Sequence, residues 1–93
     1  MGTETATETF TLEEILAAVK DGHRLILWND DFNTFDHVIH CMMHHLQYSE
    51  GEAARIAFKV HNEGKCAVLE GSYTEMEIYR KILKSEGLTV SVE

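Results

Sequence analysis

Residues 25–38 read Leu25-Ile26-Leu27-Trp28-Asn29-Asp30-Asp31-Phe32-Asn33-Thr34-Phe35-Asp36-His37-Val38. An apolar run ends abruptly in Asn-Asp-Asp, and a second apolar pattern with helical spacing then begins. This order is typical of a short strand, a polar corner and the start of a helix. The corner places one carboxamide and two carboxylates beside apolar side chains. Such a corner can hold a cation next to an apolar pocket.

The other elements follow on either side of this corner. Apolar periodicity predicts, in order, a strand at 23–28, helices at 35–47 and 50–62, a strand at 65–70, a helix at 73–86 and a half-buried strand at 88–93. Ser49 with Glu52 and Ser72 with Glu75 form capping boxes, and Gly64 is an expected helix stop. We therefore expect a small α+β domain of order (α)-β-α-α-β-α-β, with a three-stranded antiparallel sheet and helices packed on one face.

Residues 1–22 are expected to form an acidic extension to a core domain at 23–93. Five acidic residues against Lys20 leave a net charge of −4 in this segment. The Thr/Glu-rich residues 1–10 are expected to be mobile, and a capping box opens a short amphipathic helix over 12–20. The acidic charge could serve as a handle for a basic partner.

Charge and composition exclude several classes of function. The formal net charge is −8, with 16 Asp and Glu against 8 Lys and Arg, and no basic cluster for nucleic acid is present. No apolar run is long enough to span a membrane, and no secretory signal is visible. Cys41 and Cys66 lack metal or redox spacing. We expect two buried free thiols, a cytoplasmic location and no cofactor.

The polar corner predicts an amine-binding site. Asn29, Asp30 and Asp31 supply oriented acceptors and negative charge, and His61 at a helix end can accept a hydrogen bond when neutral. An α-ammonium group suits this set, because each bond is charge-assisted. Its side chain would then lie between two helices, against Phe35, Val38, Ala57 and Val60. The alternative, a turn with a helix-capping carboxylate, stays open.

Two further kinds of chemistry are weaker alternatives. His40 and His44 are spaced i, i+4, so they could bind zinc or copper if a third ligand came from elsewhere; a solvated polar face is the favoured explanation. A Cys66–His61 pair is the remaining nucleophile candidate. No complete set of nucleophile, base and orienting group is visible, so we expect no enzyme.

Three pieces of this chain resemble the ClpS family, the adaptors of the bacterial N-end rule pathway. The first is the stretch from Leu27 to Phe35, which matches the family's apolar-Asn-Asp-Asp-aromatic corner. The second is Val60-His61-Asn62-Glu63-Gly64-Lys65, which matches Val-His-x-x-Gly-Lys, and the third is the closing helix and strand around Leu88. The combination is specific and covers about residues 23–93.

The resemblance implies a peptide-binding adaptor. Such proteins bind substrates that begin with Leu, Phe, Tyr or Trp and deliver them to a ClpA-type AAA+ unfoldase of the Clp protease. Carried over by position, the α-amino group would be held by Asn29, Asp30, Asp31 and His61. The side-chain pocket would be lined by Asn33, Phe35, Val38, Ala57, Val60 and Leu88. The alternative is a similar protein that docks on an unfoldase and recognises another ligand.

The chain departs from the family pattern in three places. Many relatives have Thr-Pro-Met where this chain has Asn33-Thr34-Phe35, and many have Met at the position of Ala57. A smaller residue at 57 should widen the pocket while Phe35 refills it, so we expect a retuned preference among bulky first residues. The family's N-terminal extension is flexible and engages the unfoldase during delivery, whereas part of this one is expected to be helical.

Overall fold

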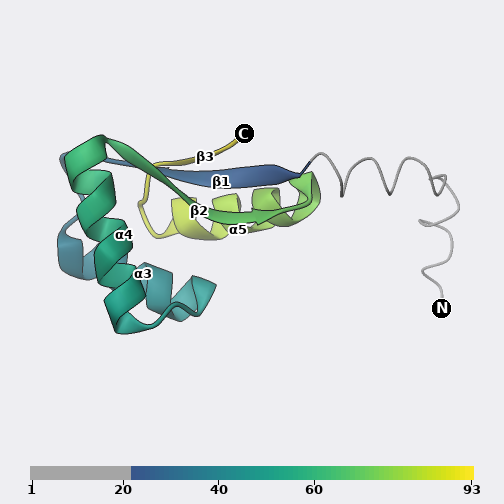
Figure 1. The fold of residues 1–93 in the computed structure, drawn as a ribbon. Helices are drawn as coiled ribbons and strands as arrows, with labels where there is room; N and C mark the ends of the chain where they lie inside the picture. Colours follow the sequence, from purple (N-terminus) through teal and green to yellow (C-terminus); the bar gives the residue numbers. More distant parts are fainter. Residues whose placement is uncertain (1–21) are drawn as a thin grey trace, which may run out of the picture.

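The computed structural model describes residues 22–93 as alternating strands and helices (Figure 1). Its elements are β1 (His23–Trp28), α3 (Phe35–Leu46), α4 (Glu50–Glu63), β2 (Lys65–Gly71), α5 (Tyr73–Ser85) and β3 (Val90–Val92). The order β-α-α-β-α-β agrees with the prediction for the core. The segments predicted to be mobile (1–10) and helical (12–20) lie outside the described residues.

The three strands form one antiparallel sheet in the order β2-β1-β3, with β1 at its centre. Figure 1 shows α3, α4 and α5 on the same side of this sheet, as the sequence predicted. The register shifts between Leu25 and Ile26, which pair with Leu69 and Ala67 and leave Val68 as the extra residue of a bulge. The polar corner therefore leaves the sheet at the end of its central strand.

The hydrophobic core lies between the sheet and the helices. Leu25 and Leu27 are 0% and 1% exposed and belong to this core, together with residues from all three helices: Val38, Cys41, Met42, Ala53, Ala57, Val60, Met76 and Leu83. The apolar run of β1 leads one to expect a strand covered on both faces; Ile26 agrees, at 4% exposed, but Trp28 does not, at 37% exposed. Trp28 projects from the face opposite the helices, where its indole N–H donates to Ser91 Oγ at 2.8 Å.

Local signals place the helix ends closely. Both capping boxes are formed, with Ser49 and Glu52 opening α4 and Ser72 and Glu75 opening α5. The prediction for the last strand was wrong at its start, because Leu88 precedes β3. The Leu88 backbone N–H donates to the Leu83 carbonyl at 3.1 Å, so this residue belongs to the turn between α5 and β3. Its side chain is 4% exposed and packs in the core.

Membrane insertion of a helix finds no support in this fold. Within residues 22–93, no helix combines the length and the apolar character needed to cross a bilayer.

Candidate functional site

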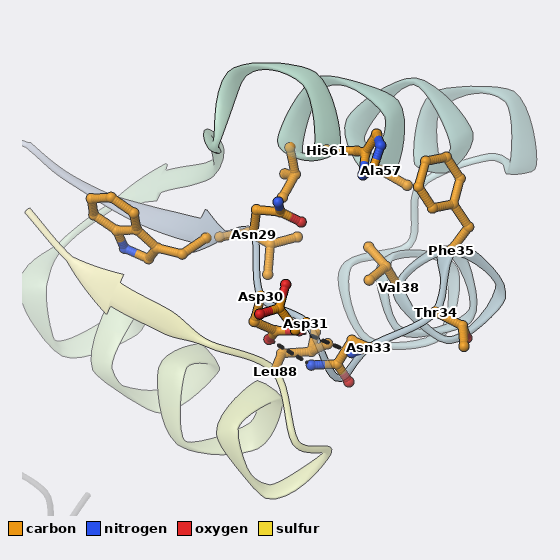
Figure 2. A pocket seen from close by; sticks show the side chains of 13 residues that line it. Asn29, Asp30, Asp31, Asn33, Thr34, Phe35, Val38, Ala57, His61 and Leu88 are labelled. Carbon is orange, nitrogen blue, oxygen red and sulfur yellow. Dashed lines mark hydrogen bonds between the residues drawn. The ribbon is translucent and has the colours of Figure 1, made fainter.

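The carboxylate of Asp30 organises the corner between β1 and α3 (Figure 2). Its Oδ1 accepts hydrogen bonds from the backbone N–H groups of Phe32 and Asn33, both at 2.9 Å. Its Oδ2 accepts from the Asn33 amide at 2.7 Å and from the Thr89 hydroxyl at 2.8 Å. The Asn33 amide also donates to the Gly87 carbonyl at 2.9 Å. The corner is thereby tied to the segment between α5 and β3.

These bonds keep Asp30 ionised. Partial burial acts to raise the pKa of this carboxyl, but the hydrogen bonds from Asn33, Thr89 and Phe32 outweigh it and hold the pKa below its ordinary value. The view of the corner as a turn is thus correct for Asp30. The cap of α3 is not a carboxylate, however, because Thr34 Oγ1 accepts from the backbone N–H of His37 at 3.1 Å.

Three neighbouring polar side chains remain open to a ligand. Asn29, Asp31 and His61 are exposed, and none of the three side chains receives or donates a hydrogen bond within the described part of the chain. The Asn29 backbone N–H donates to the Gly64 carbonyl at 2.9 Å, which holds the end of α4 against the corner. His61, in the last turn of α4, therefore lies across from the corner (Figure 2).

An apolar cavity of about 230 Å³ opens beside these groups. All ten residues predicted for the site line it, and so do Leu27, Trp28 and Thr34, which the prediction lacked. Its inner wall is buried and comes from α3, α4 and the turn before β3: Val38, Ala57, Val60 and Leu88. Small-molecule pockets occupy about 300–1,000 Å³. This smaller cavity suits a single side chain.

Phe35 and His61 face each other at the edge of the cavity (Figure 2). Their rings meet edge to face, with centroids 5.4 Å apart and planes at 70°. Phe35 is 42% exposed, whereas Ala57, one turn before His61 on α4, is 3% exposed. A bulky aromatic from α3 thus stands at the mouth, and a small residue from α4 lies in the buried wall beside it. The aromatic contact links the mouth to the polar rim.

Sequence reasoning missed two groups that hold the corner. The Thr89 hydroxyl donates to Asp30, which lies 59 positions away in the chain. The Gly87 carbonyl accepts from the Asn33 amide, 54 positions away. No local pattern marks either residue, since a single hydroxyl and a single carbonyl become partners only when α5 and β3 pack.

The histidine-rich helix α3 holds a different set of ligand atoms from the predicted one. The rings of His40 and His44 stack at 5.5 Å, as their spacing allows. No third His, Cys, Asp or Glu of residues 22–93 joins them in a metal-binding group. The group that does come together consists of His37, Cys41 and Glu86, whose ligand atoms lie within 4.8 Å of one another.

Both cysteines are buried free thiols, as predicted. Burial raises the pKa of Cys66, and its thiol donates to the Ala67 carbonyl at 3.4 Å. A nucleophilic thiolate is therefore disfavoured at this position.

The fold and the cavity define a small α+β domain with a pocket of side-chain size beside an acidic corner. Residues 19–91 match the family described as ATP-dependent Clp protease adaptor protein ClpS. The chain belongs to this family of adaptors, which confirms the resemblance seen in its motifs.

Curated relatives give the same result. The ATP-dependent Clp protease adapter protein ClpS of Synechocystis is 36% identical over 69 residues, which cover 73% of this chain and 70% of the relative. The protein of the same name from Nostoc is 36% identical over 70 residues, or 74% of this chain and 72% of the relative. The Mycobacterium tuberculosis protein is 34% identical over 68 residues, or 73% and 67%.

A solved structure shares the fold. The structure of Agrobacterium tumefaciens ClpS2 bound to L-phenylalaninamide superposes with a TM-score of 0.72. The match covers 77% of this chain and 94% of that chain, at 22% sequence identity.

Proposed function

We propose that this chain binds the free α-amino group and the bulky apolar first side chain of N-degron substrates and delivers them to a ClpA-type AAA+ unfoldase for degradation. The observation that carries the proposal is the pairing of a cavity of about 230 Å³ with a rim of exposed polar side chains that have no hydrogen-bond partner within residues 22–93. An N-terminal residue bears an ammonium group and a side chain on one carbon atom. It can therefore fill both parts of the site at once.

The ammonium group is assigned to Asn29, Asp31 and His61. Its three N–H donors match a carboxamide oxygen, a carboxylate and a neutral imidazole nitrogen. Asp30 takes a different part from the one expected from the sequence. Its oxygens already accept four hydrogen bonds from the chain, so in this proposal it positions the corner and adds negative charge without touching the ligand.

A free N-terminus is distinguished from an internal or acetylated residue by this rim. A neutral amide has no ammonium to offer, so acceptors covered by such a peptide would be left unpaired, at about 1–3 kcal/mol per group. The ligand in the A. tumefaciens ClpS2 structure, L-phenylalaninamide, carries a free α-amino group and an aromatic side chain. This chemistry agrees with the proposal.

The first side chain is assigned to the apolar wall of the cavity. Leu, Phe, Tyr and Trp are bulky side chains that would bury a large apolar area there. Asn33, Phe35, Val38, Ala57, Val60 and Leu88 surround the space. Phe35 and Ala57 lie where preference among the four is set, since one fills and the other opens the mouth.

Delivery is the second half of the proposal. The family is one of Clp protease adaptors, and we assign the unfoldase partner to the ClpA type and the activity to the cytoplasm. A degradation assay with purified unfoldase and protease, using a folded reporter that begins with Phe, should show faster loss of reporter when the full chain is added. The same reporter beginning with Gly is the control.

The binding half is tested by fluorescence anisotropy with two labelled peptides, one beginning with free Phe and the other its N-acetylated twin. The pair differs mainly in the ammonium group. We expect the free peptide to bind at least tenfold more tightly. Equal affinities would contradict the proposal.

A second candidate function is an adaptor that docks on an unfoldase with another ligand. The exposed Phe35 at the mouth favours this second candidate, because Phe35 departs from the family pattern at the edge of the pocket. This candidate predicts no binding of either peptide, together with retained docking on the unfoldase in a pull-down.

A further inference from the structure

A cluster of metal-ligating side chains lies between α3 and the turn that follows α5, outside the peptide pocket. Helix α3 contributes His37 and Cys41, and Glu86 comes from the turn that follows α5. We propose that His37, Cys41 and Glu86 form a binding site for a zinc-class divalent cation.

The separation of the two α3 ligand atoms fits one ion, and the Glu86 ligand atom lies within 4.8 Å of both. His37 Nε2 and Cys41 Sγ are 3.7 Å apart. Two ligands of a tetrahedral zinc ion, with Zn–N of about 2.0–2.1 Å and Zn–S of about 2.3 Å, lie about 3.6 Å apart. The spacing i, i+4 on α3 produces this separation, since it sets the two side chains on one face. One imidazole, one thiolate and one carboxylate are a ligand set that zinc accepts.

His45 supports the carboxylate of the site. Its Nε2 and Glu86 Oε2 are 2.7 Å apart, and this hydrogen bond lowers the pKa of Glu86, against a smaller opposing effect of desolvation. The contact with His45 orients the Glu86 carboxylate and engages one of its two oxygens. Hydrogen-bonded partners of this kind are a regular part of metal sites.

Binding exchanges existing interactions for metal bonds. His37 Nε2 now lies 2.7 Å from the Glu86 carbonyl oxygen, and this hydrogen bond would give way to the ion. Burial raises the pKa of Cys41 to about 11, with the Glu86 charge adding to the effect. The thiol therefore releases its proton to solvent as the metal–sulfur bond forms.

The site is reachable from solvent and connects two walls of the peptide pocket. Cys41 is 0% exposed, but the side chains of His45 and Glu86 are 19% and 36% exposed, which leaves a path for the ion. Val38 follows His37 directly, and Leu88 lies two residues beyond Glu86. An ion at this point would hold α3 and the turn before β3 together. Zinc should therefore raise the melting temperature of the chain.

The test is a titration of the full chain with Zn²⁺ in competition with a chromophoric chelator, followed by Co²⁺ spectroscopy. We expect one ion per chain, release of a proton, and a thiolate-to-cobalt charge-transfer band in the near ultraviolet. Cys41→Ser should remove the band, while Cys66→Ser, the matched control at the other buried thiol, should keep it. Glu86→Gln, a change at a partly exposed position, tests the site if Cys41→Ser fails to fold.

The expected magnitudes separate ligands from supporting residues. His45→Ala should weaken zinc affinity by about 10–100-fold, as loss of an outer hydrogen-bond partner does, and Glu86→Gln should weaken it by at least as much. His40→Ala/His44→Ala should leave the affinity unchanged. Absence of zinc binding, or binding that survives both Cys41→Ser and Glu86→Gln, would overturn the proposal. These measurements use no peptide, so their outcome is independent of N-degron recognition.

Discussion

Asp30 and Asp31 are neighbours in the chain, yet their carboxylates lie in different surroundings. Asp30 accepts four hydrogen bonds and, with Asn33, forms the closed half of the corner. Asp31 lies with Asn29 and His61 in the open half, where the side chains are exposed and lack hydrogen-bond partners among residues 22–93. The contrast teaches that two carboxylates of the same type can have different roles. A carboxylate whose hydrogen bonds are made within the chain holds the site together, whereas one without such partners can bind a ligand.

The largest effect is expected from Asp30→Asn. This change places an amide N–H₂ against the donors of Asn33 and Thr89, so hydrogen bonds to a charged group are lost and at least one donor is left unpaired. The free energy of unfolding should fall by about 2–3 kcal/mol. Urea denaturation measures it, and Asp31→Asn is the matched control, with an expected change within about 0.5 kcal/mol. Equal losses of unfolding free energy in the two variants would show that Asp30 and Asp31 stabilise the fold to the same extent, which would contradict the distinction between the closed and the open half.

Asp31→Asn should act on binding instead. Loss of one charge-assisted hydrogen bond to an α-ammonium group should cost about 1.5–2 kcal/mol, or roughly 10–30-fold in affinity for a peptide beginning with Phe. Anisotropy titration measures the affinity, and the urea midpoint of the same sample shows that the fold is intact. An unchanged affinity would exclude Asp31 from the amine site.

Phe35→Ala sharpens the comparison at the mouth of the cavity. Removal of the ring opens the mouth and ends its contact with His61, so selectivity among peptides beginning with Leu, Phe, Trp and Ile should change by about 1 kcal/mol, or roughly fivefold. Ala57→Met adds bulk at the mouth and should shift preference in the opposite direction. A ranking that is the same in both variants and in the original chain would contradict the assigned role of Phe35.

The smallest effect concerns acid stability. The pKa of Asp30 is lower in the folded chain than its ordinary value of 3.8. The folded state therefore gains stability that is fully present above the unfolded pKa and is lost as the pH falls through the lower folded pKa. The difference in unfolding free energy between the original chain and Asp30→Asn should shrink below about pH 4. A difference that stays constant down to pH 2 would show that the charge of Asp30 is not stabilising.

Much of the fold was predictable because its signals are local. Each capping box joins a serine to a glutamate three residues later, and both predicted boxes within the described chain form as expected. The final strand was placed too early, since the alternation of Leu88, Val90 and Val92 resembles a strand although Leu88 lies in the turn between α5 and β3. Apolar alternation reports burial, and burial alone does not distinguish a strand from a packed turn.

The amino-acid sequence by itself determined the strand, corner and helix around residues 25–38, the helix ends to within one residue and most of the residues that line the cavity. These depend on neighbours within a few positions, or on motifs of the ClpS family. Three of the four hydrogen bonds to Asp30 are local. Tertiary structure alone decided that Thr89 supplies the fourth, and that His37 and Cys41 meet Glu86 while His40 and His44 meet no third ligand within residues 22–93. Each of these outcomes depends on contacts between residues 45 to 59 positions apart, such as Cys41 with Glu86 and Asp30 with Thr89, which form only when α5 and β3 pack against the corner and α3.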